Sequence, residues 1–222
     1  MGDTKAQADS QALRWQSELS DGLQQMGLEL SEHQQQQLLE YLQLLVKWNN
    51  VFNLTAIRDP DEMVSRQLLD SLSILPWVRG SSILDVGTGA GLPGIPLAIA
   101  LPKIQFTLLD SNGKKTRFVQ QAAAQLGLKN VSVVNQRVES ISGADGFDVI
   151  TSRAFSALAD FIAGTRHLLA PDGRWLAMKG LADKETPELP HGTESRTHTL
   201  FVPGCEGQRH LVEVQATAET QQ

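Results

Sequence analysis

The chain has 222 residues, of which 41% are apolar, with a single cysteine and a net charge of −6 at pH 7. This length predicts one sizeable core with an added segment, and it implies no second catalytic domain. The lack of an apolar run of about 18 residues, of a signal peptide and of a second cysteine predicts a cytoplasmic protein without a membrane span or an intramolecular disulfide.

The charge is unevenly distributed along the chain. Residues 110–180 hold nine Lys/Arg and six Asp/Glu, a balance of +3, which leaves −9 for the remainder. The overall negative charge argues against broad, nonspecific binding of nucleic acid. The basic balance of residues 110–180 still favours a local anionic ligand in that half.

The first 80 residues have the patterns of helices. Residues 1–10 predict an irregular end, and a helix is expected over residues 11–26. Ser31 and Gln34 form a capping box ahead of a helix over residues 32–49. Asp59-Pro60-Asp61-Glu62 supplies a cap, a first-position proline and acids for a third helix. We therefore expect a helical extension over residues 1–80, packed on a core of residues 81–222.

The remainder alternates between strand and helix patterns, which predicts an α/β fold with a mainly parallel sheet. Two final strands, Thr197–Val202 and His210–Val214, are joined by a loop too short for a parallel crossover, so they predict an antiparallel hairpin. The expected parallel strands and helices are strands 82–86, 104–110, 130–135, 147–151 and 174–179 with helices 94–101, 112–126 and 156–169.

The first expected strand runs into a glycine-rich turn. Gly87, Gly89 and Gly91 allow a sharp bend and a close approach of a ligand to the backbone. Residues 89–94 also match G-x-G-x-x-G, the pattern of dinucleotide-binding proteins, although this match alone is weak. The turn predicts a nucleotide pocket without identifying the nucleotide.

Two acidic residues distinguish the possible cofactors. Asp85 precedes the first glycine, where its carboxylate would repel a pyrophosphate and attract the ammonium group of S-adenosylmethionine (SAM). Asp110 ends the next strand, where an acid bonds ribose hydroxyls. The alternative is that Asp85 only caps a turn and Asp110 ends its strand by chance. Five parallel strands closed by an antiparallel pair, a Rossmann-like sheet of seven, favour a SAM-dependent methyltransferase over a dehydrogenase.

Charged residues follow or precede several of these elements. Arg137, Val138 and Glu139 come directly after the third strand, where the adenine and its ribose would rest. Lys114 and Lys115 open a helix beside Asp110, an unfavourable end for cations, which makes a phosphate contact plausible for at least one. Arg137 is a further candidate for contact with RNA. The five histidines form no metal-like cluster, so no metal is expected.

The ends of the fourth and fifth strands bear on the reaction. Enzymes that methylate exocyclic amines of bases usually carry an Asn/Asp-Pro-Pro-aromatic motif here, and those that attack pyrimidine carbons need a nucleophilic cysteine. Residues 151–155 contain neither. This pattern favours a target nitrogen with a free lone pair, such as guanine N7, whose methylation depends on positioning. Arg153 and Lys179 are candidates to hold RNA phosphates or the base. The alternative for each is a surface ion pair.

Over residues 20–215 the sequence resembles the bacterial small-subunit ribosomal RNA methyltransferase G family. This resemblance implies methyl transfer from SAM to N7 of one guanine in the decoding region of 16S rRNA, and cofactor contacts at Gly87, Leu92, Val138, Glu139 and Arg153. The matching motifs are Lys47-Trp48-Asn49, Phe52-Asn53-Leu54-Thr55, Leu69-Asp70-Ser71, Asp85 to Pro96, Leu109-Asp110-Ser111, Gly113-Lys114-Lys115, Ser152-Arg153-Ala154-Phe155 and Lys179-Gly180.

Two positions depart from the family pattern. Gln67 stands where many members have histidine, which argues against a functional role for position 67, and Ala90 replaces a common proline in the glycine turn. The expected target also imposes a condition, because N7 of a paired guanine lies in the deep, narrow groove of A-form RNA. We therefore expect structured 16S rRNA or the small subunit, with the guanine open or flipped out, to be the substrate.

Other functions remain open from the sequence. A SAM-dependent methyltransferase could act on a small molecule or a protein instead. A noncatalytic RNA- or ribosome-binding module could keep the nucleotide pocket for stability, and an NAD dehydrogenase is the least favoured reading. The sequence implies no particular oligomeric state.

Overall fold

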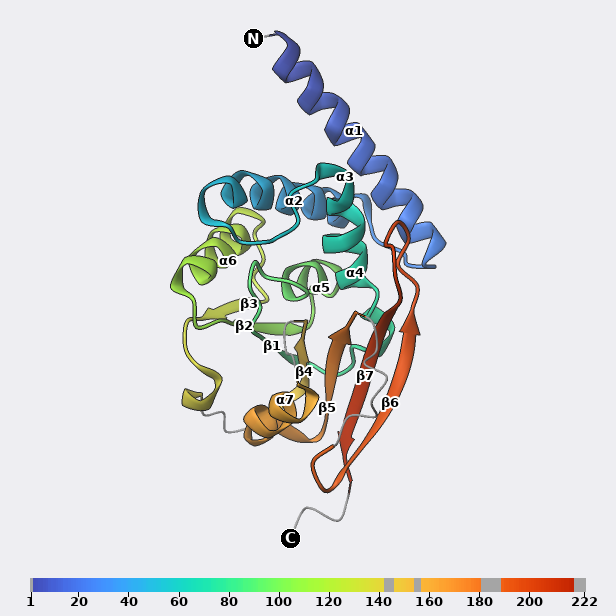
Figure 1. Cartoon of the computed structure of the whole chain (residues 1–222). Coiled ribbons are helices and arrows are strands. Elements are labelled where there is room, and N and C mark those ends of the chain that lie inside the picture. The colour runs from blue at the N-terminus through green and yellow to red at the C-terminus, as the bar shows by residue number, and fades with distance from the viewer. Residues whose placement is uncertain (1, 142–145, 154–156, 181–188, 218–222) are drawn as a thin grey trace.

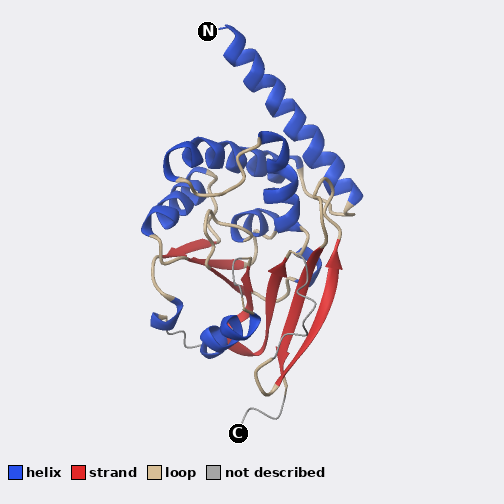
Figure 2. Cartoon of the chain, viewed as in Figure 1, coloured by secondary structure: helices blue, strands red, loops and turns tan. Residues whose placement is uncertain are grey.

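A computed structural model of the chain describes residues 2–141, 146–153, 157–180 and 189–217. Its centre is a seven-stranded sheet with the order β3-β2-β1-β4-β5-β7-β6, flanked by helices (Figures 1 and 2). The strands are β1 (Ser82–Val86), β2 (Gln105–Leu109), β3 (Val131–Val134), β4 (Phe147–Ser152), β5 (Leu169–Lys179), β6 (Thr193–Leu200) and β7 (Arg209–Ala216).

The sheet confirms the expected mixture of strand directions. Strands β1 to β5 pair in parallel, and β7 pairs antiparallel with both β5 and β6. The strand order reverses between β1 and β4, and ligands of open α/β sheets bind at such a point, beyond the carboxyl ends of the strands. The fold therefore places Asp85 of β1 and Ser152 of β4 at the expected binding edge.

Helices cover both faces of the sheet. One apolar cluster joins Ile83 and Phe106 of the sheet to the N-terminal helices, α5 and α6. The other joins Leu84 and Trp175 to α7 on the opposite face. The helices are α1 (Gly2–Gln25), α2 (Glu32–Phe52), α3 (Pro60–Met63), the π-helical η1 (Val64–Leu69), α4 (Asp70–Leu72), α5 (Gly94–Ala100), α6 (Gly113–Gln125) and α7 (Leu158–Thr165), with short 3₁₀ turns at Leu75–Trp77, Val138–Ser140 and Arg166–Leu168.

Several boundaries differ from the sequence prediction. Helix α1 begins at Gly2 instead of near residue 11, because residues 3–21 contain no proline or glycine that would interrupt a helix. Its first turns project beyond the body of the protein (Figure 1). The helix capped by Asp59 continues through a π-helical segment to Leu72. Strand β5 starts at Leu169 instead of residue 174, because Leu169 already pairs with Phe147 of β4 ahead of an irregularity, after which the pairing continues from Arg174. The expected start of the helix at residue 156 lies outside the described residues.

Polar contacts fix the N-terminal helices to the core. The capping box of Ser31 and Gln34 is present, and the Gln34 side chain also donates to the carbonyl of Ile99, at 2.9 Å. The buried Tyr41 hydroxyl donates to the carbonyl of Ala90, in the glycine turn, at 2.7 Å. Helix α2 is therefore bonded directly to the glycine turn that follows β1.

None of the described helices is both long and apolar enough to cross a membrane.

A stability test follows from the packing of Gly94. A Cβ at this position would lie 2.2 Å from Leu108 Cδ2 and 2.8 Å from Asp85 Oδ2. We expect Gly94→Ala to lower the free energy of unfolding by about 1–3 kcal/mol through overpacking. Gly164→Ala in α7, where a Cβ meets nothing within 4 Å, should instead raise it by up to about 1 kcal/mol. Urea unfolding measures both, and equal stability of the two variants would contradict the packing argument.

Candidate cofactor and substrate site

The glycine turn after β1 is built around one carboxylate. Gly87, Gly89 and Gly91 have φ values of 68°, 62° and 90°, which non-glycine residues rarely adopt. Asp85 Oδ2 accepts hydrogen bonds from Thr88 Oγ1 at 2.6 Å and from the Gly94 backbone N–H at 3.0 Å. The carboxylate therefore fixes both the bend and the start of α5.

Asp85 is 0% exposed, so its carboxylate lies behind the turn. Burial raises its pKa to about 6, an effect that its hydrogen bonds with Thr88 and Gly94 oppose. Its second oxygen, Oδ1, is buried and has no hydrogen-bond partner among the described residues. A buried acceptor without a donor is costly, and a cationic ligand close to the turn would relieve that cost.

Asp110 lies across the turn from Asp85, directly after β2. Its Oδ2 accepts from the Gly89 N–H at 2.9 Å and its Oδ1 from the Asn112 N–H at 2.8 Å. The Asn135 side chain donates to the Asp110 backbone carbonyl at 2.9 Å. These bonds hold the carboxylate in one orientation, with lone pairs left to accept from a ligand.

Beside Asp110 opens a cleft of about 260 Å³, here called the Asp110 cleft. Five residues that the sequence marked for cofactor or RNA contact come together on its walls: Gly87, Asp110, Arg137, Val138 and Glu139. A Cβ at Gly87 would meet nothing within 4 Å, so this wall is bare backbone facing open space. The cleft combines an apolar side chain, carboxylates and exposed backbone, a set suited to a nucleoside.

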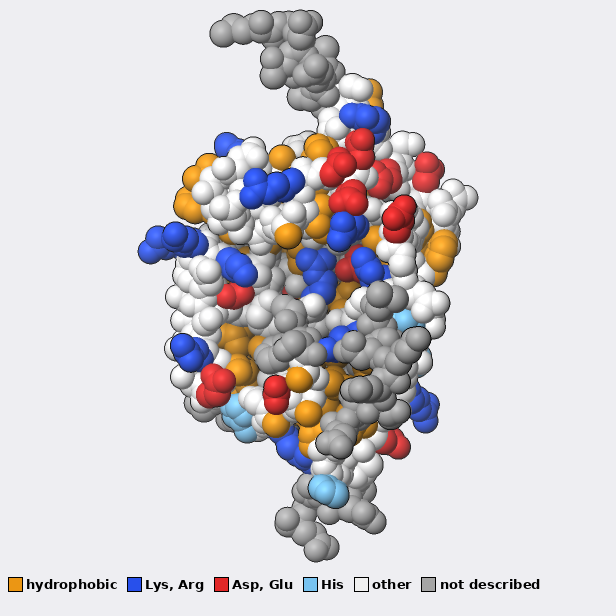
Figure 3. Space-filling model, viewed as in Figure 1, with side chains coloured by type: hydrophobic (Ala, Val, Ile, Leu, Met, Phe, Trp, Pro, Cys, Tyr) orange, Lys and Arg blue, Asp and Glu red, His pale blue; other side chains and the backbone are white. Residues whose placement is uncertain are grey.

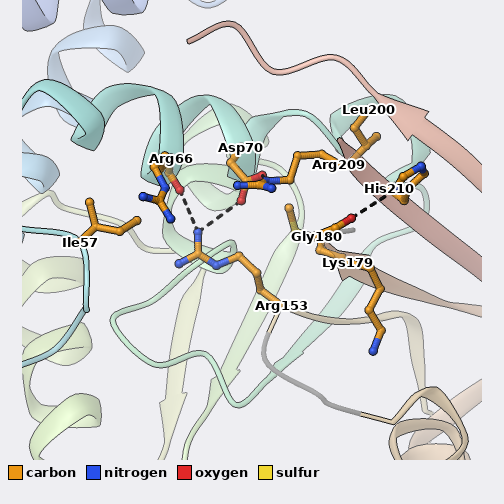
Figure 4. Close-up of a pocket in the computed structure, with 10 residues that line it drawn as sticks. Ile57, Arg66, Asp70, Arg153, Lys179, Gly180, Leu200, Arg209 and His210 are labelled. Atoms are coloured by element: carbon orange, nitrogen blue, oxygen red, sulfur yellow. Dashed lines mark hydrogen bonds and ion pairs between the residues drawn. The ribbon is translucent and has the colours of Figure 1, made fainter. Parts of the chain in front are cut away.

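A second pocket, of about 250 Å³, is here called the Arg153 pocket (Figure 4). Arg153 and Lys179, the strand-end cations marked by the sequence, both line it. Its other lining residues are Ile57, Arg66, Asp70, Met178, Gly180, Leu200, Arg209 and His210. Four Lys/Arg and one Asp make it strongly basic, which suits an anionic ligand.

Arg153 is held from three directions. Its Nη1 donates to the Arg66 carbonyl at 3.2 Å and to Asp70 Oδ2 at 3.4 Å, and its Nη2 donates to Gln67 Oε1 at 3.0 Å. Arg209 Nε lies 3.3 Å from the other oxygen of Asp70. Burial raises the pKa of Asp70, while Arg153 and Arg209 oppose the shift. One carboxylate thus joins two arginines.

The surface charge agrees with this arrangement. Figure 3 shows Lys and Arg side chains gathered in the middle of the visible face, while acidic side chains concentrate nearer to α1. Among the described residues, no group of three or more His, Cys, Asp and Glu is placed to hold a metal ion.

Other residues marked by the sequence do not line either pocket. Gly89 and Gly91 shape the turn, and Leu92 is 3% exposed and packs in the core, so its side chain belongs to the fold. Lys114 is exposed and Lys115 half-buried in the first turn of α6. Ala154 and Phe155, part of the expected motif after β4, lie outside the described residues.

Sequence reasoning missed Arg66, Asp70, Arg209 and His210 as lining residues. It examined the carboxyl ends of parallel strands, whereas Arg209 and His210 begin β7. Because β7 is antiparallel, its first residues lie beside the last residues of β5, as the pairing of Lys179 with His210 shows. The predicted hairpin contained the signal for both residues. The sequence marked Asp70 only as part of the motif Leu69-Asp70-Ser71 and did not indicate which residue it would contact.

Curated relatives cover nearly the whole chain. Ribosomal RNA small subunit methyltransferase G of Ectopseudomonas mendocina is 58% identical over 203 residues, which cover 90% of this chain and 95% of the relative. The proteins of the same name from Stutzerimonas stutzeri and Marinobacter nauticus are each 56% identical, and the matches cover 90% of this chain and 95% and 94% of theirs.

Solved structures share the fold at low identity. A SAM-dependent methyltransferase from Aquifex aeolicus superposes with a TM-score of 0.55 at 19% identity, covering 73% of this chain and 96% of that one. A 1,6-didemethyltoxoflavin-N1-methyltransferase from Burkholderia thailandensis superposes with a TM-score of 0.54 at 16% identity, covering 80% of this chain and 89% of that one.

The family model for rRNA small subunit methyltransferase G matches residues 34–212. The chain belongs to the rRNA small subunit methyltransferase G family.

Proposed function

We propose that this protein transfers a methyl group from SAM to N7 of one guanine in the decoding region of 16S rRNA. Family membership supports methyl transfer to small-subunit rRNA. The observation that carries the proposal further is the pair of pockets at the carboxyl edge of the sheet. The Asp110 cleft has the groups for a nucleoside, and the Arg153 pocket has the charge for RNA.

The residues at the turn fit SAM. Asp110 would accept from the ribose hydroxyls, Val138 would pack on the adenine, and Gly87 lets the ligand approach the backbone. Asp85 supports the ammonium group of the methionine part through its charge, which acts strongly across the buried turn. Gly89, Gly91 and Leu92 would contribute through their backbone, and Glu139 through its place in the cleft.

The chemistry requires placement more than proton transfer. SAM supplies an electrophilic methyl group on a positively charged sulfur. Guanine N7 carries a lone pair and no proton, so no general base is needed, and the protein has to hold the acceptor about 3–3.5 Å from the methyl carbon, in line with the sulfur. Arg153 and Lys179 would hold the base or its phosphates in the Arg153 pocket.

The RNA would extend beyond the pocket. Lys114, Lys115 and Arg137 are further candidates for phosphate contact. We propose that the N-terminal helical extension, residues 1–80, docks on the core of residues 81–222 and forms one wall of the substrate site, as Ile57, Arg66 and Asp70 suggest. Such a substrate places the activity in the cytoplasm. A methyltransferase with another substrate and a noncatalytic ribosome-binding module remain the alternatives.

The reaction can be tested directly. We expect SAM labelled in its methyl group to modify one guanine when the pure protein is incubated with unmodified 16S rRNA or small subunits. Cleavage chemistry specific for N7-methylguanine locates the label. A short duplex of the same sequence should accept no label, because its N7 is inaccessible. Label at another atom would refute N7 as the target, and efficient labelling of the duplex would refute the requirement for an open guanine.

The Asp85 carboxylate predicts opposite effects on stability and binding. Its folded pKa of about 6 exceeds the ordinary value of 3.8, so its contribution to stability is present below about pH 4 and is lost as pH rises through 6. Asp85→Asn should therefore stabilise the ligand-free protein at pH 8 by up to about 3 kcal/mol, with no gain at pH 4. Thermal unfolding at the two pH values measures this.

The same Asp85→Asn variant should bind SAM at least tenfold more weakly at pH 8, because the charge facing the ammonium group is lost. Calorimetric titration measures the affinity. An unchanged affinity for SAM would remove Asp85 from the cofactor site, whatever the stability result.

Salt should separate an RNA substrate from a small molecule. We expect the affinity for 16S rRNA to fall at least tenfold between about 50 and 200 mM salt, through counterion release. Lys179→Ala should reduce the slope of log affinity against log salt by about 1. Lys129→Ala is the matched control, since Lys129 is exposed at the opposite, amino edge of the sheet, before β3. Equal slopes for the two variants would contradict the placement of RNA at Lys179.

A further inference from the structure

The side chain of Gln67 makes specific hydrogen bonds, although its departure from the family pattern argued against a functional role for this position. The side chain is 0% exposed and lies in the π-helical segment η1. Its Oε1 accepts from Arg153 Nη2 at 3.0 Å, and its Nε2 donates to Thr55 Oγ1 at 2.8 Å. Both ends of the amide are therefore used, in a segment type that is frequent at functional sites.

The contacts continue on both sides of Gln67. Thr55 is held in turn, since its N–H donates to Asn49 Oδ1 at 2.9 Å. On the other side Arg153 reaches Asp70, whose second oxygen faces Arg209. One connected set of polar contacts thus runs from the end of α2 through η1 to the start of β7.

Arg153 needs such support because of the charges around it. Arg66, Arg209 and Lys179 line the same pocket, and like charges would push a free guanidinium towards solvent. Among the described residues that line the pocket, Asp70 is the one carboxylate, and it also contacts Arg209. Gln67 Oε1 is a neutral acceptor on the other terminal nitrogen, and acceptors on both nitrogens fix the plane of the guanidinium. Figure 4 shows the contacts of Arg153 with Arg66 and Asp70.

The guanidinium still has donors for a ligand. Its contacts with Arg66, Asp70 and Gln67 use three of its N–H groups, out of five in an arginine. Held in this way, the remaining donors keep a fixed direction before a substrate arrives. Preorganised donors lower the barrier more than mobile ones, because they need no reorientation during the reaction.

We infer that Gln67, assisted by Asp70, is a positioning residue that fixes the Arg153 guanidinium for methyl transfer. The inference rests on the proposed function for its effect on the reaction, while the orientation of Arg153 is a property of the protein alone. Gln67 acts through Arg153 and does not itself touch the reacting atoms. A neutral imidazole also offers one acceptor and one donor, so histidine can fill the same role at position 67.

The kinetic test compares three variants. Gln67→Leu has a similar size but can neither accept from Arg153 nor donate to Thr55. It should lower kcat for rRNA methylation at least tenfold, while the KM for RNA changes less than about threefold, because the Arg153 charge remains. Gln67→His should recover kcat to within about threefold of the wild type. Ser73→Ala removes a buried 2.6 Å bond to the Asp70 carbonyl, without touching Arg153, and should leave kcat unchanged within twofold.

A spectroscopic measurement tests the inference without measuring methyl transfer. The ¹⁵N guanidinium signals of Arg153, assigned by their loss in Arg153→Lys, should show slow rotation in the wild type and in Gln67→His. In Gln67→Leu they should show fast rotation. Wild-type kcat in Gln67→Leu, no recovery in Gln67→His, an equal loss in Ser73→Ala, or slow rotation retained in Gln67→Leu would each overturn the positioning role. A wild-type protein that methylates no rRNA would instead refute the proposed function, and the signals would still decide the inference.

Discussion

The buried carboxylate of Asp85 is the interaction on which the site depends. It holds Thr88 and the first N–H of α5 with one oxygen, which sets the path of the glycine turn. Burying this charge is unfavourable, as its raised pKa shows. A cation bound close to the turn would therefore be stabilised by this charge. Asp110 fixes the opposite side of the turn by accepting a hydrogen bond from the Gly89 N–H. The geometry of the Asp110 cleft follows from these two acids.

Much of this arrangement could be predicted from local sequence patterns. The β1 strand, the glycine turn and Asp110 follow from alternation and spacing, and a short loop required the final hairpin to be antiparallel. The patterns also placed Val138 and Glu139 in the cleft. Each of these features depends on residues that are neighbours in the chain or that lie at the ends of adjacent parallel strands.

The Arg153 pocket could not be predicted in the same way, because it joins segments more than 80 residues apart. Asp70 and Gln67 lie on a helix whose π-helical turn has no clear signal in the sequence. Their role depends on how the N-terminal helices pack, which periodicity does not specify. The helices that precede β1 therefore supply polar contacts to Arg153 through Gln67, and Tyr41 adds a hydrogen bond to the glycine turn.

The hairpin that brings Arg209 to the pocket also protects one border of the sheet. Among the described strands β6 pairs with β7 alone, and its residues Thr193 to Thr199 are mostly polar and solvent-facing. Exposed edges invite pairing with other chains, and charged side chains such as Glu194 and Arg196 oppose it. The opposite border, β3, has only four residues. Charged side chains on β6 and the short length of β3 therefore oppose edge-to-edge pairing with other chains at both borders of the sheet.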